Sequence, residues 1–214
     1  MLCVHSKNRM PFICHNFAGD MMAPSAIPQS VELQKKLTDL HIEQWLADDF
    51  LKIRWWVLLG LLIAMGIAWL LLLDKAKVKE ACLFLVLAII VIMGIDEYGE
   101  ELVLWDYPTD LIPIFPPLTS ANLMSVPLAY SIAFQRFPDL KRYAIAVVIL
   151  TAIICFLWEP VLVWGGLYEL VNWHHAFNFF VYLIAAFSVR FMANKILQIE
   201  HKARGPVKTG NGRS

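Results

Sequence analysis

The sequence has 214 residues, of which 59% are hydrophobic and only 17% are charged, and its 18 basic and 18 acidic residues give a formal net charge of zero. Soluble globular domains are about 45–50% apolar, so this composition excludes an ordinary soluble domain and indicates an integral membrane protein. The balanced charge provides no basic surface for nucleic acid, and we expect no nucleic-acid partner.

The N-terminal part of the chain is polar and then becomes helical in character. Residues 1–30 mix Gly, Pro, Ser and Asn without a period, which predicts a disordered tail. Its Cys and His residues do not have the spacing of a metal site, and we expect no cofactor. In residues 31–53, Leu33, Leu37 and Leu40 share one stripe. This spacing predicts an amphipathic helix that either lies in the membrane interface or packs on its own protein.

Five apolar segments predict an all-α, polytopic transmembrane bundle over residues 54–200, followed by a flexible tail at residues 201–214. The third segment contains four prolines, so we expect its helix to begin at Pro116 or Pro117 and to bend at Pro127. The predicted spans are Trp55–Leu73, Ala81–Gly99, Leu111–Phe134, Tyr143–Trp164 and Ala176–Met192.

Lys and Arg residues concentrate in alternate loops, and this asymmetry predicts the orientation. The loops at residues 96–110 and 165–173 contain no Lys or Arg. The pattern predicts a cytoplasmic C-terminus and an N-terminus outside, although the basic residues before the first span oppose this orientation. The basic residues of the other loops are Lys75, Lys77, Lys79, Arg136, Lys141, Arg142, Arg190, Lys195, Lys202 and Arg204.

The second predicted span ends in Asp96, Glu97, Glu100 and Glu101. On a helix, residues four apart are neighbours, so these acids form two adjacent pairs. The apolar run Ala81–Ile95 is shorter than the roughly 20 residues that cross a bilayer, so the acids begin before the membrane ends. They form either a cation-binding or proton-accepting mouth or an acidic outer rim that keeps the loop in water.

Glu159 is flanked by apolar residues inside the fourth predicted span. A charge facing lipid costs about 2.5 kcal/mol or more, so we expect Glu159 to face the bundle interior, toward the span-two acids or His174. The following Pro160 removes a helical hydrogen bond. Glu159 is either a satisfied structural group or a ligand or proton site. His174 and His175 point about 100° apart on a helix, and Trp173 beside them indicates an interfacial anchor.

The sequence contains no catalytic signature such as Gly-x-Ser-x-Gly or His-Glu-x-x-His. We favour a non-catalytic sensor, accessory or interaction protein that acts through its outer acidic and aromatic face. Its partners would be the lipid bilayer and other membrane proteins or a second copy. The alternative is a small transporter or a cation- or proton-binding protein that uses Glu159 and the span-two acids. Segments such as Leu83–Met93 and Val147–Cys155 carry almost no polar groups, which favours the first hypothesis.

A succession of aromatic, proline and acidic residues resembles a family of small, multi-pass, uncharacterised membrane proteins of spore-forming Bacillota. The resemblance covers roughly Trp45 to Lys195. It implies a five-helix architecture in the cell membrane of a Gram-positive host, and it supplies no activity. This chain departs from the family at Asn122 and at Phe134-Gln135. The residues that carry the resemblance are Trp55-Trp56, Asp96, Trp105-x-Tyr107-Pro108, Pro113, Pro127, Tyr130, Phe156-x-x-Glu159-Pro160, Gly166-x-Tyr168 and Trp173.

Overall fold

The computed structural model describes residues 28–113 and 121–204, which form an almost entirely helical structure. The chain divides into two compact units, one up to Leu40 and one from His41 onward. In the first unit the described residues are helical from Gln29, and a Glu32–Lys36 pair at 3.6 Å joins successive turns. The elements are α1 (Gln29–Gln44), η1 (Trp45–Asp49), α2 (Ile53–Leu72), η2 (Lys75–Lys77), α3 (Val78–Glu101), β1 (Trp105–Asp106), α4 (Ala121–Arg136), α5 (Leu140–Ile153), η3 (Ile154–Trp158), α6 (Glu159–Trp164), β2 (Glu169–Leu170) and α7 (His175–Arg204).

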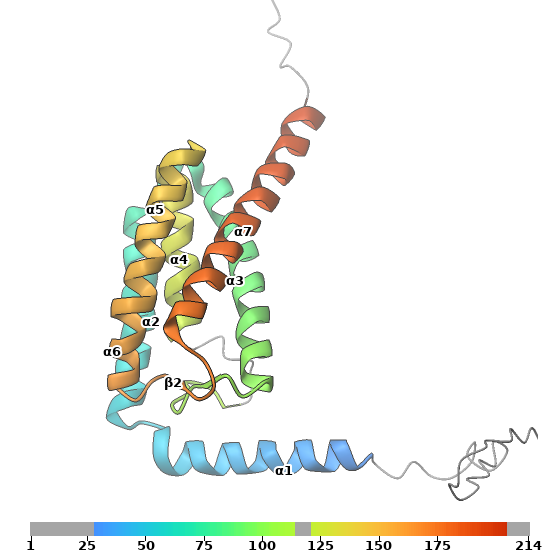
Figure 1. Cartoon of the computed structure of the whole chain (residues 1–214), viewed down its shortest axis with the longest axis vertical. Coiled ribbons are helices and arrows are strands. Elements are labelled where there is room, and N and C mark those ends of the chain that lie inside the picture. The colour runs from blue at the N-terminus through green and yellow to red at the C-terminus, as the bar shows by residue number, and fades with distance from the viewer. Residues whose placement is uncertain (1–27, 114–120, 205–214) are drawn as a thin grey trace, which may run out of the picture. The chain divides into compact units, whose positions relative to one another are not determined.

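Four helical segments of the described chain are long and apolar enough to cross a membrane, which supports a membrane location. They are Ile53–Leu72, Lys75–Glu101, Leu140–Trp164 and His175–Ala203. Figure 1 shows that α2, α4 and α7 run in one direction along the bundle, whereas α3 and the continuous path of α5 and α6 run in the opposite direction. Only 6% of the apolar window of α2 is buried, so most of this helix is available to lipid.

The third predicted span corresponds to α4, of which the structure describes 16 residues. This helix packs chiefly against α3 and α2, and Phe134 stacks on Phe84 with ring centroids 4.6 Å apart. Pro127 lies inside the helix and is buried, and the bend there stays a prediction. The expected helix start at Pro116 or Pro117 lies outside the described residues.

Basic and polar side chains join three helices at the end of the bundle that contains η2. The backbone N–H of Asp74 donates to Oε1 of Gln135 at 2.9 Å, and Lys77 donates to the Gln135 carbonyl at 3.3 Å. From α7, Arg190 donates to the carbonyl of Phe137 at 3.0 Å, and Lys79 pairs with Glu200. The three basic segments therefore meet at one end of the bundle.

The opposite end contains a two-stranded antiparallel pair that the all-α prediction did not include. Trp105 of β1 lies opposite Leu170 of β2, and the backbone N–H groups of Val171 and Asn172 both donate to the carbonyl of Leu104. This pairing places the two loops that lack Lys and Arg side by side. Such a pair is invisible to local sequence patterns because its partners are more than 60 residues apart.

The predicted amphipathic helix at residues 31–53 is wrong at its C-terminal end. The helical path begins at Gln29, passes through the π-helical η1 and stops at Asp49, and α2 starts a new helix at Ile53. Leu51 in the connection has φ of +60°, a left-handed conformation that costs a non-glycine residue about 1 kcal/mol or more. The chain therefore turns sharply immediately before the first span.

A buried stripe runs along α5, η3 and α6 at intervals of four residues. Tyr143, Val147, Thr151, Cys155 and Glu159 are each 0% exposed. An ordinary α-helix has 3.6 residues per turn, so residues four apart drift gradually around the axis. The π-helical turn at Ile154–Trp158 widens the helix locally and opposes this drift, which keeps Glu159 on the buried face.

Candidate functional site

The candidate site is built around Glu159, the first residue of α6. Its carboxylate is fully buried and accepts hydrogen bonds from Nδ2 of Asn178 at 3.0 and 3.1 Å. The second oxygen also lies 2.7 Å from Nδ1 of His175. Unpaired burial of a carboxylate is very costly, so these partners on α7 are what permits an acid at this depth.

The orientation of the Asn178 side chain follows from its neighbours. The indole N–H of Trp173, which can only donate, lies 2.7 Å from Oδ1 of Asn178. Oδ1 is therefore the acceptor, and Nδ2 must point the other way, toward Glu159 and toward the hydroxyl of Tyr168 at 3.2 Å. The indole of Trp173, which lies outside α7, thus fixes the orientation of the Asn178 amide that binds Glu159.

A second buried acid, Asp96 on α3, lies near this network. The Tyr107 hydroxyl donates to Oδ1 of Asp96 at 3.1 Å, and the Tyr107 ring lies 5.2 Å from the ring of Tyr168. Tyr182 of α7 is within electrostatic range of both Asp96 and Glu159. The two acids are therefore linked by three tyrosines from two loops and one helix.

Of the other acids predicted at the end of span two, Glu100 is within electrostatic range of Asp96. Glu97 and Glu101 are exposed, and Glu100 is half-buried. This arrangement agrees with an acidic rim for Glu97 and Glu101. It leaves Asp96 as the one member of the four that is buried in the described structure.

The sequence offers His174, His175, Tyr168 and tryptophan N–H groups as partners of Glu159, and of the two histidines it is His175 that contacts the carboxylate. His174 is exposed and stacks loosely on Phe177, with ring centroids 6.0 Å apart. The prediction that Trp173 is an interfacial anchor stays a prediction; its ring is half-buried and its N–H donates to Oδ1 of Asn178. Neighbouring helical residues diverge by about 100°, so only one of the two histidines can face the bundle interior.

The predicted structural prolines occupy different environments. Pro108 is exposed beside the buried Tyr107. Pro160 lies in the first turn of α6, directly after the π-helical turn in which the Glu159 N–H donates to the carbonyl of Ile154. The widened turn accommodates the proline, whose missing N–H is least costly at a helix start.

The inner part of the bundle is more polar than the sequence indicated. The hydroxyls of Tyr130 and Thr151 lie 2.7 Å apart, and Thr151 also donates to the carbonyl of Val147. Ser131 bridges Trp69 of α2 and the carbonyl of Ala81. The expectation that the inner halves carry almost no polar groups overlooked these side chains because they are few within long apolar runs.

Three residues of the site were missed in the sequence: Asn178, Tyr182 and Tyr107. A signal was present, since His175, Asn178 and Tyr182 are spaced three and four apart and so share one helix face. Within the described residues, no group of three or more His, Cys, Asp or Glu side chains has the geometry of a metal site. The cysteines and histidines of the N-terminal tail lie outside those residues.

Comparisons with protein-family models, with characterised proteins and with solved structures find no match to this chain.

Proposed function

We propose that the chain crosses the membrane five times, with α4 as the third span. Support comes from the β1–β2 pair, whose strands must lie on the same side of the membrane because they are hydrogen-bonded. An even number of crossings must therefore separate Asp106 from Glu169, and only one of the four long apolar segments, Leu140–Trp164, lies between them. The helix available for the second crossing is α4.

We further propose that the membrane is the plasma membrane of a Gram-positive bacterium, as the family resemblance implies, and that the chain is oriented with its C-terminus in the cytoplasm. The basic residues around η2, at the end of α4 and along the end of α7 support this orientation, because Lys and Arg favour the cytoplasmic side. The paired loops with β1 and β2 then face outward.

In this membrane the protein acts as a non-catalytic, proton-responsive sensor or accessory protein. The observation that carries this proposal is the Glu159–His175 contact. The carboxylate is completely buried, whereas 28% of the His175 side chain is exposed. Histidine is the side chain whose charge changes most readily near neutral pH. Protons from the outer side therefore have access to one partner of a buried pair.

Gain or loss of a proton at this pair would alter the charge of a poorly hydrated site. The groups that face it are Asn178 and Tyr182 on α7, Tyr168 in the loop, and Cys155 on its own helical stripe. Because Asn178 also binds Trp173 and Tyr168, the rearrangement would reach the loop that carries β2. A partner protein would then recognise the change on the outer face, which contains this loop.

Hydrogen–deuterium exchange of the full chain in lipid nanodiscs tests this proposal. We expect protection of residues 165–173, after correction for the intrinsic exchange rate, to differ between about pH 5.5 and about pH 7.5. The difference should disappear in Glu159→Gln and His175→Gln, while Glu169→Gln, an exposed acid in β2, serves as the matched control. Equal protection at both pH values in the wild-type protein would refute the proposal.

A second candidate function is proton transfer through the bundle. The observation that favours it is the stripe from Glu159 through Cys155 to Thr151, with Tyr130 hydrogen-bonded to Thr151. If this stripe carries protons, liposomes that contain the protein and an internal pH dye should leak protons. Tyr130→Phe should then stop the leak and leave the pH-dependent exchange of residues 165–173 unchanged.

A further inference from the structure

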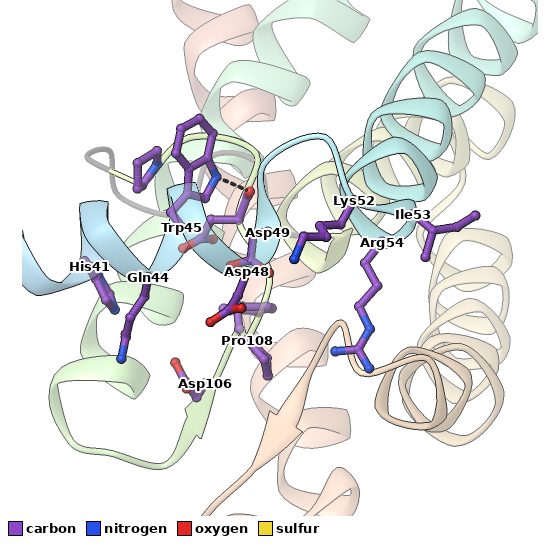
Figure 2. Close-up of a pocket in the computed structure, with 13 residues that line it drawn as sticks. His41, Gln44, Trp45, Asp48, Asp49, Lys52, Ile53, Arg54, Asp106 and Pro108 are labelled. Carbon is purple, nitrogen blue, oxygen red and sulfur yellow. Dashed lines mark hydrogen bonds between the residues drawn. The ribbon is translucent and has the colours of Figure 1, made fainter.

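A cavity of about 480 Å³ lies beside the start of α2, and of the residues in the Glu159 network only Tyr107 lines it. Its wall comes from η1 and the chain just before and after it, and from the loop that follows β1. Figure 2 shows Asp48 and Asp106 on one side of this cavity and Lys52 and Arg54 on the other. Its volume is that of a small-molecule site.

Lys52 and Arg54 lie within electrostatic range of Asp49, but neither forms a close ion pair in the cavity. Asp48 and Lys52 are four residues apart and would pair on a continuous helix. The helix ends at Asp49, however, and Leu51 turns the chain away in a left-handed conformation. Among the described residues, no ion pair within 4.0 Å joins Lys52 or Arg54 to an acid. The local fold thus separates charges that a simpler helix would bring together.

The basic side of the cavity adjoins the lipid-facing surface of α2. Ile53 lines the cavity and is 81% exposed, and Trp56 and Val57 continue the exposed apolar surface. Tryptophans at this end of a span favour the headgroup level of a bilayer. A group held between Lys52 and Arg54 would therefore lie where lipid phosphates lie.

We propose that this cavity binds a zwitterion that carries a primary ammonium group and a phosphate, as in the headgroup of phosphatidylethanolamine. Arg54 and Lys52 bind the phosphate, because a guanidinium and an ammonium are the groups that recognise it best. The ammonium, with three N–H donors, is held by Asp48 and Asp106, with Asp110 adding negative charge nearby.

The charge of the cavity argues against simpler ligands. A plain anion would meet the four aspartates that line the cavity, Asp48, Asp49, Asp106 and Asp110, and a plain cation would meet Lys52 and Arg54. A choline headgroup has both charges, but its quaternary ammonium has no N–H to donate to the carboxylates. In addition, burial raises the pKa of Asp110 to about 6, so a cationic group nearby would relieve the cost of its ionised form.

Native mass spectrometry of the full-length protein in detergent tests the proposal, with short-chain phosphatidylethanolamine, phosphatidylcholine and phosphatidylglycerol as probes. We expect the wild-type protein to retain phosphatidylethanolamine about tenfold better than the other two, since charge-assisted hydrogen bonds distinguish the headgroups. Lys52→Gln, Arg54→Gln and Asp48→Asn should each abolish this preference. Lys141→Gln, exposed at the other end of the bundle, and Glu169→Gln should keep it.

Free phosphoethanolamine distinguishes a lipid from a soluble source of the same chemistry. If it displaces the bound lipid only weakly, the ligand is the lipid headgroup; if it binds alone and phosphatidylethanolamine is not retained, the ligand is a soluble zwitterion. Equal retention of all three lipids together with no binding of phosphoethanolamine would overturn the proposal. So would an unchanged preference in the Lys52, Arg54 and Asp48 variants, whose folding is checked by thermal unfolding.

Discussion

At the scale of single residues, buried polar groups in this protein are accommodated by partners from distant parts of the chain. Glu159 is held by Asn178, and Asn178 is held in turn by Trp173. Each hydrogen bond contributes little net stability by itself, but a partner left unsatisfied in the interior is expensive. The network is therefore sensitive to the loss of a polar group and tolerant of its replacement by another polar group.

The first prediction concerns Glu159. We expect Glu159→Gln to unfold near the wild-type temperature because an amide retains an acceptor for Asn178. Glu159→Leu should lower the free energy of unfolding by about 1–3 kcal/mol for each partner left unsatisfied. Thermal unfolding in detergent measures both, with Glu169→Gln as the exposed control. Equal stability of Glu159→Leu and the wild-type protein would show that the network does not stabilise the fold.

The second prediction concerns Asp110, which lies outside the membrane spans. Burial raises its pKa from the ordinary 3.8 to about 6; His41 opposes this shift, and Asp106 and Asp49 add to it. The folded protein therefore binds more protons than the unfolded chain between about pH 4 and pH 6, so its stability falls as pH rises through this window. In Asp110→Asn this loss should be absent. The melting temperature of Asp110→Asn minus that of the wild-type protein should therefore increase from pH 4 to pH 7. If this difference does not change with pH, the raised pKa of Asp110 is contradicted.

At the scale of the elements, the end of α3 determines where the outer loop begins. The N–H of Leu104 donates to the carbonyl of Gly99, and the N–H of Val103 donates to the carbonyl of Glu100. These two bonds form a Schellman motif, whose left-handed position usually contains glycine. Here it contains Val103, with φ of +54° and 57% of its surface exposed. The motif is thus formed at a conformational cost.

The third prediction follows from that cost. Val103→Gly removes a penalty of about 1–2 kcal/mol for the left-handed conformation and adds an entropy cost of about 0.5–1 kcal/mol. We expect a net stabilisation of roughly 0.5–1 kcal/mol. Val86→Gly, at an exposed position in the middle of the same helix, should instead destabilise by roughly 0.3–0.5 kcal/mol, because glycine is a poorer helix former than valine. Chemical denaturation of both variants should give opposite signs, and the same sign in both would contradict the strain argument.

The elements with a strong apolar period could be predicted from the sequence, and the contacts between elements could not. The fourth predicted span, Tyr143–Trp164, corresponds to the segment Leu140–Trp164, because hydropathy alone identifies a long apolar run. The last helix continues to Arg204, beyond the predicted end of the fifth span at Met192 and into the tail predicted from residue 201, since helical hydrogen bonds do not stop where charged residues begin. The burial of Glu159 followed from the cost of a charge in lipid, whereas its pairing with Asn178 depends on how two helices pack.

At the scale of the whole molecule, the two ends of the bundle differ in chemistry. One end gathers Lys77, Arg190 and the carbonyls of the loop after α4. The other end contains the β1–β2 pair, the exposed acids and the mixed-charge cavity. At each end, hydrogen bonds connect segments that are far apart in the sequence. The basic loops therefore gather at one end of the bundle and the loops without Lys or Arg gather at the other. If the chain crosses the membrane as we propose, the two ends lie on opposite sides of it.

The last prediction is the orientation itself. In a background without native cysteines, Lys77→Cys should be protected from a membrane-impermeant thiol reagent added to intact cells, and Asp106→Cys should react. The physical reason is that basic loops stay on the cytoplasmic side. In addition, residues 106 and 169 must lie on the same side of the membrane because β1 and β2 are hydrogen-bonded to each other. Glu169→Cys therefore serves as the internal control and must label like Asp106→Cys. Labelling at position 77 with protection at positions 106 and 169 would invert the orientation, and opposite results at 106 and 169 would exclude α4 as a span.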